Sequence, residues 1–430
     1  MPKVIIRQTT PPDTTLQVNG VTEGTHVAGS TIGINLSDGT NPVTPDSVTK
    51  VGDNYEVAVP SGWVRNPQWP QFEEEIDTIQ MVWGVYEGRL NGFSFIISGD
   101  WEYDYGDGTT GVGGGFEHEY DYSTINAPIL VDKNGDNYKP VLIHLKYLSD
   151  PSPVLFFSIN ASSPYENNIL DLWVNLDDSR DNNITYNISR SSYMTKCERF
   201  RTNARFRDDQ TMNGRLNNMF SLRVLSLPEN FFANGFSNLN AFNNSGAGAP
   251  NIVLGDLEFG VNISNTFNNC GFKKFGKLYG DDVTTCNTTF FCSEVEEIDD
   301  IDFPEATSQL QMFWRSSLRK IGTINMPKLT TYNRMFAETP VEELVFTDSS
   351  LVTNVDNFVD DSKNLKRLVV PGMTRGFSII QAQLDKDALE EFYTSLGTAS
   401  GTQTLDVRFN PGTLTADHTI ATAKGFTVLT

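Results

Sequence analysis

Length, composition and charge limit what this chain can be. Its 430 residues are 38% hydrophobic and include 28 Phe, which is sufficient for packed cores in more than one domain. The formal net charge of −22 argues against non-specific binding to nucleic acid or to anionic lipid. No stretch approaches the ~20 apolar residues of a membrane helix, and the N-terminus shows no secretory signal. We therefore expect no nucleic-acid partner, no membrane insertion, and a protein that either stays where it is made or leaves by assembly or lysis.

Residues 1–62 are predicted to form a small antiparallel β module. The segments "TLQVNG", "STIGINLSDG" and "NYEVAVPSG" are β-prone, and each is bounded by Asn, Gly, Asp or Pro. Short strands separated by such turns are typical of antiparallel β structure, and no helical periodicity interrupts them.

Residues 63–150 are predicted to form a β-sandwich of immunoglobulin size. The segment "DWEYDYGDG" alternates Trp101, Tyr103 and Tyr105 with acidic residues, which is the period-2 pattern of a strand with one aromatic face. The "GDG" that follows predicts a turn, because its glycines adopt positive φ without steric cost. Further strands are expected in "IQMVWGVYEG", "GFSFIISG", "FEHEYDY" and "YKPVLIHLKYL".

Two groups of acidic residues raise the alternative of a bound calcium ion. Asp104 and Asp107 lie at the glycine turn, and Asp132, Asn134 and Asp136 have the alternating spacing of the start of a calcium loop. The second group lacks the glycine and the glutamate that an EF-hand requires further along. Asx-type turns explain both groups without a metal, so we predict no cofactor and keep a structural Ca²⁺ ion as the alternative.

The motifs of residues 63–150 resemble those of a PKD-type module. "WEYDYGDGTTG", "FEHEYDY" and "YKPVLIHL" match its GDGT turn, its H-x-Y strand and its final V-x-L strand. The preceding "VPSGWVRNPQW" resembles the segment before this module in virion-associated proteins of tailed phages that infect Bacteroidota. This resemblance implies an immunoglobulin-like fold and a role in attachment or spacing.

Residues 151–212 are interpreted as a transition and as the N-terminal cap of the domain that follows. One apolar strand, "NNILDLWVNL", stands among polar loops. The stretch "CERFRTNARFR" combines four arginines with aromatic residues, but it is short and lies in an acidic chain. We interpret it as a salt-bridged strand surface rather than as a nucleic-acid site.

Residues 213–375 contain seven copies of a Phe-centred repeat. The repeated residues are Phe220, Phe242, Phe267, Phe290, Phe313, Phe336 and Phe358. Their successive spacings are 22, 25, 23, 23, 23 and 22 residues, and an apolar pair follows each Phe. A steady period in this range predicts a solenoid, in which neighbouring units bury one another's apolar faces.

The repeat resembles the BspA-type leucine-rich repeat, above all in "NNMFSLRVLSLPENF" and "NRMFAETPVEELVF". The resemblance implies a leucine-rich-repeat solenoid that presents an extended binding surface. Cys270 occupies a position where other units carry Ser or Thr, and no CxxC pair is present. We therefore interpret Cys270 and Cys292 as small apolar residues of the structure.

Residues 376–430 depart from the repeat and are predicted to cap the solenoid. The segment "DKDALEEFYTSLGTASG" predicts a helix that ends near Gly397. Its apolar face carries Leu384, Ala388, Leu389, Phe392 and Leu396. A strand, a turn, a short helix and a last strand are expected after it. The ending resembles the closing cap of the same repeat proteins, with Phe426 in place of a Trp.

Catalysis is poorly supported by the sequence. The four His residues lie near no nucleophile motif, and among 54 Asp and Glu residues neighbouring acids are expected by chance. We predict no enzymatic activity and no catalytic residue. Trp314 and Tyr332 are the ligand-binding candidates, because aromatic side chains exposed between repeats stack on sugars or anchor proteins. The alternative is that both pack between neighbouring coils.

These patterns and resemblances lead to one functional prediction. We expect a mainly β, non-enzymatic virion protein of a phage, made in the host cytoplasm and released by lysis. Its N-terminal modules are expected to contact other virion proteins. Its repeats, in several copies per particle, are expected to bind a host-surface glycan or protein, as in a tail-associated fibre. Three alternatives stay open: a head or neck fibre or decoration protein without receptor role, a bacterial cell-surface adhesin, and a carbohydrate-active enzyme.

Overall fold

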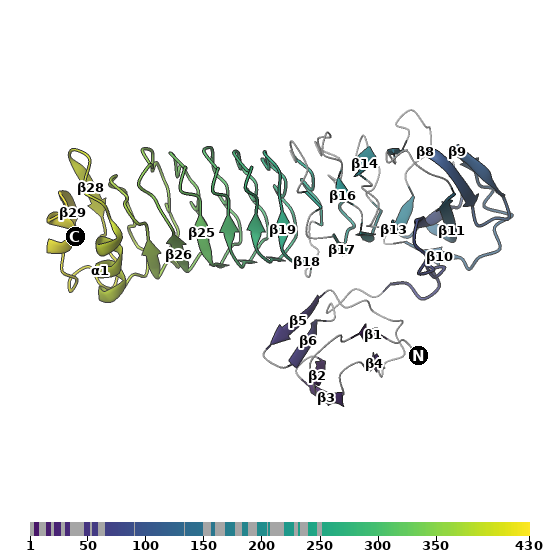
Figure 1. The fold of residues 1–430 in the computed structure, drawn as a ribbon, viewed down its shortest axis with the longest axis horizontal. Coiled ribbons are helices and arrows are strands. Elements are labelled where there is room, and N and C mark those ends of the chain that lie inside the picture. The colour runs from purple at the N-terminus through teal and green to yellow at the C-terminus, as the bar shows by residue number, and fades with distance from the viewer. Residues whose placement is uncertain are drawn as a thin grey trace.

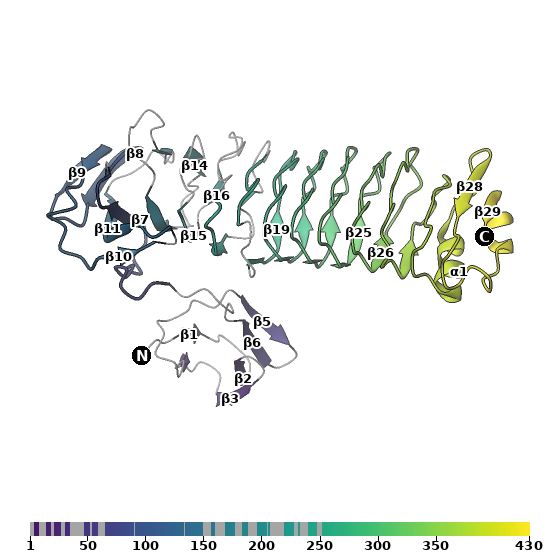
Figure 2. The same ribbon diagram turned by 180° about the vertical axis from the view of Figure 1, so that it is seen from behind.

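The computed structural model describes the protein from Arg65 to the C-terminus with several gaps. The described ranges are 65–89, 91–132, 134–148, 168–176, 196–203, 219–227, 231–232, 240–246 and 252–430, and elsewhere only the backbone of the strands named below. The protein is mainly β, with 32% strand and 5% helix, and contains a β-solenoid of about nine turns. A β-sheet lies at one end of the solenoid and the C-terminal helix at the other (Figures 1 and 2).

Six short strands lie within the first 62 residues. They are β1 (Val4–Arg7), β2 (Thr14–Val18), β3 (Val21–His26), β4 (Thr31–Ile34), β5 (Ser47–Val51) and β6 (Asn54–Ala58). β1 pairs with β4, and a second sheet has the order β3-β2-β6-β5. The β segments expected here are strands, but the purely antiparallel arrangement is wrong. β2 and β6 are parallel, and the three strands between them in sequence provide the long connection that a parallel pair requires.

Residues 65–148 form the central part of a larger sheet. Its strands are β7 (Thr78–Tyr86), β8 (Gly92–Asp104), β9 (Thr110–Glu119), β10 (Leu130–Val131) and β11 (Asn137–Tyr147). β11 pairs antiparallel with β7 and with β8, and β8 also pairs antiparallel with β9. The expected aromatic face is confirmed, because Trp101 and Tyr105 are buried whereas Glu102 and Asp104 are not.

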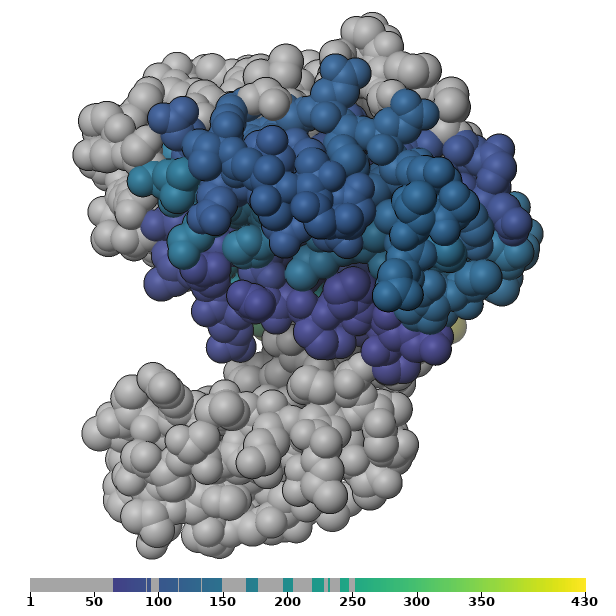
Figure 3. Space-filling view, turned by 90° about the vertical axis from the view of Figure 1, so that its right-hand side faces the viewer, coloured from purple at the N-terminus to yellow at the C-terminus, as the bar shows by residue number. Residues whose placement is uncertain are grey.

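The same sheet continues directly into the solenoid. β13 (Ile169–Asn175) pairs antiparallel with β7 and parallel with β15 (Arg199–Thr202), which pairs parallel with β17 (Val224–Ser226). β12 (Phe156–Ile159) pairs antiparallel with β8. It also pairs parallel with β14 (Asn183–Asn187), which in turn pairs parallel with β16 (Arg205–Phe206). Figure 3 views this end, where residues 65–148 form much of the surface in front of the solenoid. One hydrophobic core therefore runs from Ile79 to Phe426.

Of the arginines of "CERFRTNARFR" that the structure describes, Arg199 is buried and Arg201 is only partly exposed. Parallel pairing sets Arg199 of β15 opposite Asp171 of β13, and the Arg199 Nε donates to Asp171 Oδ1 at 2.8 Å. Arg65 Nε donates to the other carboxylate oxygen at 2.8 Å. Asp171 is fully buried and the two arginines are 7–8% exposed. The expected ion pairing is thus present, but the expected strand surface is wrong, since this face packs inside the junction.

Two parallel sheets run along the solenoid. One contains β18 (Val253–Leu254), β20 (Lys274–Phe275), β22 (Glu297–Ile298) and β24 (Lys320–Ile321). The other contains β19 (Leu257–Glu258), β21 (Leu278–Tyr279), β23 (Ile301–Asp302), β25 (Thr323–Asn325), β26 (Glu343–Phe346) and β27 (Arg367–Val369). The register pairs equivalent residues of neighbouring turns, such as Phe275 with Ile298 and Ile298 with Ile321. The predicted solenoid is confirmed.

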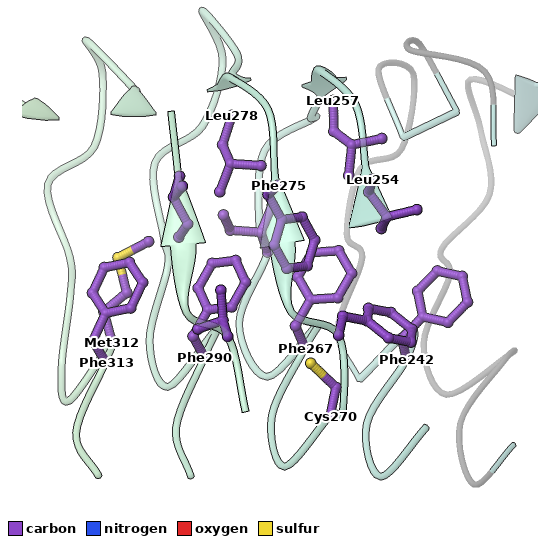
Figure 4. Packing of buried hydrophobic residues seen from close by; sticks show 14 of the residues in the cluster. Phe242, Leu254, Leu257, Phe267, Cys270, Phe275, Leu278, Phe290, Met312 and Phe313 are labelled. Atoms are coloured by element: carbon purple, nitrogen blue, oxygen red, sulfur yellow. The ribbon is translucent and has the colours of Figure 1, made fainter. Parts of the chain in front are cut away.

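A column of stacked Phe rings fills the solenoid core (Figure 4). Its members are Phe242, Phe267, Phe290, Phe313 and Phe336. Successive ring centroids lie 6.0, 5.3, 5.2 and 5.1 Å apart, with interplanar angles of 4°, 16°, 6° and 11°. The repeat period therefore places identical rings in contact, which adds to the burial of each ring.

The two outermost positions of the predicted Phe repeat are wrong by one residue. Phe220 is 45% exposed, whereas Met219 is fully buried. At the other end, the Phe336 N–H donates to the carbonyl oxygen of Phe358. One turn earlier, the Phe313 N–H donates to the carbonyl oxygen of Met335, the residue that precedes the column residue Phe336. Val359 rather than Phe358 is therefore equivalent to Phe336, at the usual distance of 23 residues. Phe358 is also buried, but it packs edge-on against Phe336 instead of continuing the column.

The C-terminal elements follow the predicted order. They are α1 (Lys386–Ser395), β28 (Gln403–Asp406), α2 (Thr419–Thr422) and β29 (Phe426–Leu429). Asp385 caps α1 by accepting a hydrogen bond from the Ala388 N–H, and the buried Leu389 and Phe392 face the solenoid core. β28 and β29 are paired in parallel. In the part of the chain that the structure describes, neither helix has the length and apolar character needed to cross a bilayer.

Candidate ligand-binding site

The acidic turn between β8 and β9 is held by its own hydrogen bonds. Asp104 Oδ1 accepts from the Gly106 N–H at 2.8 Å, and Asp107 Oδ1 accepts from the Thr109 N–H at 3.0 Å. Gly106 and Gly108 have φ of 77° and 95°. Both aspartates therefore act here as turn residues that bind backbone amides.

Asp107 also joins this turn to the neighbouring strand. Its Oδ2 lies 2.7 Å from His118 Nε2, and the His118 ring packs 4.7 Å from the ring of Tyr105. Burial opposes ionisation of Asp107, but hydrogen bonds from Thr109 and His118 outweigh it and lower the pKa of the carboxyl. The pair fixes the turn against β9.

The second acidic group forms a turn of the same kind. Asp132 Oδ1 accepts from the N–H groups of Asn134 at 2.8 Å and Asp136 at 3.1 Å. Asp136 forms an ion pair with Arg89. Among the described residues, no three His, Cys, Asp or Glu side chains gather in the manner of a metal site.

Tyr332, one of the two aromatic candidates, is not exposed. Its side chain is fully buried, its ring lies 4.7 Å from Phe346, and its hydroxyl lies 2.8 Å from Ser349 Oγ. The equivalent residue one turn earlier, Gln309, is also fully buried. This repeat position points into the core, so the alternative of packing between coils is correct for Tyr332 and its role as a surface ligand contact is wrong.

Trp314, the other candidate, lies half-buried beside a surface depression of about 380 Å³. The depression is lined by Trp314, Arg315, Arg334, Ala337, Glu338, Asn357 and Asp360. Phe291, Trp314, Ala337 and Asp360 are equivalent, because each follows the previous one by 23 residues. Phe291 packs 5.2 Å from Trp314, but the next turn offers only Ala337, and the missing ring leaves the hollow.

One edge of the depression is a fixed polar unit. Trp314 Nε1 donates to Glu338 Oε1 at 3.0 Å, and Arg315 Nε donates to Glu338 Oε2 at 2.9 Å. These bonds, first that of Arg315 and then that of Trp314, lower the pKa of the Glu338 carboxyl. The indole is therefore held in place from the neighbouring turn.

Three other side chains of the depression keep their hydrogen-bonding capacity. Arg334 lies over the Trp314 ring, 4.8 Å from its centroid. Within the described residues, the side chains of Arg334, Asn357 and Asp360 form no hydrogen bond or ion pair. They supply guanidinium donors, an amide and a carboxylate acceptor in one place. No motif in the sequence singles out these three residues, although the 23-residue period places the small Ala337 beside Trp314 and so signals a hollow.

Histidines and thiols elsewhere are engaged in structure. His418 Nδ1 lies 3.0 Å from the Tyr393 hydroxyl, and its Nε2 lies 2.8 Å from the Thr413 carbonyl oxygen. Cys270 and Cys286 are buried, and burial raises the pKa of Cys270 to about 12. Such thiols are protonated at neutral pH and are poor nucleophiles.

Comparisons of the chain with known protein families, with curated proteins and with solved structures find no match. Its function is therefore inferred from the sequence motifs and from the geometry of the depression at Trp314.

Proposed function

We propose that this chain is a non-enzymatic binding protein whose solenoid serves in adhesion. The observation that carries the proposal is the depression at Trp314, where an aromatic side chain lies beside Arg334, Asn357 and Asp360. Concave sites with an aromatic wall and a few convergent polar groups are typical ligand sites. A solenoid suits this role, since its surface positions vary without disturbing the stacked core.

The wider proposal is a structural protein of a tailed-phage virion. In it the N-terminal modules are immunoglobulin-like and PKD-like, the solenoid is a BspA-type leucine-rich repeat, and several copies are present per particle. The β modules attach to other virion proteins, and the repeats reach a glycan or a protein on the host surface. The arrangement of the described residues supports this use of the repeats. Both solenoid ends are covered, one by the sheet of residues 65–148 and the other by α1 and β29, so ligands have access to its sides.

The adhesive role is tested with the full-length chain, fluorescently labelled and incubated with a panel of Bacteroidota cells. We expect binding to susceptible strains, and a loss of roughly tenfold or more for Trp314→Ala, as for a central aromatic contact. Phe220→Ala, which removes an exposed ring elsewhere on the solenoid, is the matched control and should bind normally. Equal binding by both variants argues against this site.

The virion assignment has its own test. An antibody against the repeats should label purified phage particles in electron micrographs, and the position of the label separates a tail fibre from a head or neck fibre. Particles without label refute the virion part of the proposal, while the cell-binding assay continues to report on adhesion.

A further inference from the structure

The backbone of the solenoid turns carries a second signal at this depression. Each turn places two residues around its central core position in the left-handed conformation, with φ between 48° and 59°. The residues are Asn240, Asn244, Asn265, Asn269, Thr288, Cys292, Gln311, Arg315, Arg334, Glu338, Asn357 and Asp361. This conformation is unfavourable for L residues, and among non-glycine residues Asn and Asp tolerate it best.

The residue types at these positions are not evenly distributed. Asn or Asp occupies them in the first two turns and in the last. The six less tolerant residues fall in three successive turns, and the three charged ones, Arg315, Arg334 and Glu338, all line the depression. Strained backbone at a position where other turns carry a tolerant residue is a reason to look for a function. Of the six less tolerant residues, only the three charged ones combine this strain with a place in the depression.

Of these three charged residues, Arg334 is the one whose presence at a left-handed position is not accounted for by a hydrogen bond or ion pair among the described residues. Arg315 and Glu338 bind each other across neighbouring turns at 2.9 Å, which accounts for both. Arg334 has no such acceptor among the described residues, and its contact is with the face of Trp314. A cation–π contact at a partly exposed ring is weak, and it orients the guanidinium without using its donors. Those donors remain available to a ligand.

We infer that Arg334 is the specificity-determining residue of a saccharide site formed with Asn357 and Asp360, an inference that rests on the proposed adhesive function. Sugar hydroxyls both donate and accept, and this trio offers donors and acceptors together. The lining charges of the depression cancel, and the exposed Asp356 precedes Asn357 in the chain, whereas Asp361 is paired with Lys363 at 3.2 Å. A neutral or amino sugar therefore fits better than an acidic one. The volume of about 380 Å³ is large enough to hold a small ligand group.

The test uses the full-length chain and two equivalent substitutions. Arg334→Asn places a tolerant residue in the left-handed position and replaces the long guanidinium, with its five donors, by a short amide. Gln311→Asn makes the same change 23 residues earlier, outside the depression, and is the matched control. Binding is measured to immobilised oligosaccharides ending in mannose, galactose, N-acetylglucosamine or glucosamine, and to sialylated counterparts. Stability is measured as the urea midpoint.

Both variants are expected to unfold at higher urea than the wild-type chain. Arg334→Asn should bind the neutral or amino sugars at least roughly tenfold more weakly, whereas Gln311→Asn should bind as the wild type does. Undiminished binding by Arg334→Asn, or a wild-type preference for the sialylated probes, overturns the inference. Wild-type binding to cells but to no saccharide overturns the ligand class and leaves the adhesive function standing. Absence of binding to cells and to saccharides alike refutes both.

Discussion

The Phe column makes a sharp prediction for Phe290→Ala. Phe290 is fully buried, and its ring lies 5.3 Å from Phe267, 5.2 Å from Phe313 and 5.2 Å from Phe275. The substitution removes three ring contacts and leaves a cavity in the middle of the column, between Phe267 and Phe313.

The magnitude follows from these contacts. A buried Phe→Ala change costs about 3–5 kcal/mol, and each aromatic pair contributes about 0.5–1.5 kcal/mol beyond its buried area. With three pairs lost, we expect Phe290→Ala to lie at the upper end, at about 4–5 kcal/mol. In a solenoid this loss weakens the interfaces to both neighbouring turns, so amide exchange should increase first in the turns on either side.

The assay is urea unfolding followed by circular dichroism, together with native-state amide exchange. Phe220→Ala is the control, because this ring is 45% exposed, and its cost should stay within about 0.5 kcal/mol. Met219→Ala should cost about 2–5 kcal/mol, since Met219 is buried in the core. If Phe220→Ala destabilises more than Met219→Ala, the register of the first turn is wrong. A cost below about 1 kcal/mol for Phe290→Ala contradicts the column as a source of stability.

Three further predictions concern charge and thiols. Asp171→Ala leaves Arg65 and Arg199 buried without their carboxylate and should cost about 3–5 kcal/mol in urea unfolding, so an unchanged midpoint contradicts the buried ion pairs. Because the pKa of Asp107 is lowered on folding, its contribution is present above the unfolded pKa of about 3.9 and is lost as the pH falls through the folded value. Stability measured against pH should therefore fall more steeply below about pH 4 in the wild type than in Asp107→Asn, and identical acid limbs contradict this. A thiol reagent at pH 8 should modify the half-buried Cys292 before Cys270 and Cys286, whose pKa values are raised more strongly by burial, and faster reaction of Cys286 refutes the assignment.

The solenoid was accessible from the sequence because its period is repeated many times, so single ambiguous positions do not hide it. Its ends were not accessible in the same way. Met219–Phe220 and Phe358–Val359 each offer two adjacent apolar residues, and the pattern alone does not choose the one that faces inward. The choice is made by hydrogen bonds to the next turn, which place Val359 in line with Phe336.

The candidate site shows the same limit. Trp314 and Tyr332 both stand within four residues of a column Phe, yet one is half-buried at the surface and the other is fully enclosed. Arg334 and Asp360 come from different turns, and each reads in isolation as an ordinary polar turn residue. Arg334 and Asp360 line a common depression because Ala337 is small where the two preceding turns carry Phe291 and Trp314. The missing ring becomes visible in the sequence only when the turns are aligned with one another.

The charges along the solenoid give an internal comparison for this site. One row of equivalent positions alternates in sign through Lys274, Glu297, Lys320, Glu343, Arg367 and Glu391. Most neighbours in this row are ion pairs, with Glu297 3.1 Å from Lys320 and Arg367 2.7 Å from Glu391. The repeat is therefore capable of satisfying its charges between turns, as it also does for Arg315 and Glu338. At the depression it leaves Arg334 and Asp360 without such partners among the described residues, although both lie within the same hollow. Polar groups that are held together but not paired with each other are the arrangement expected where a ligand supplies the missing hydrogen bonds.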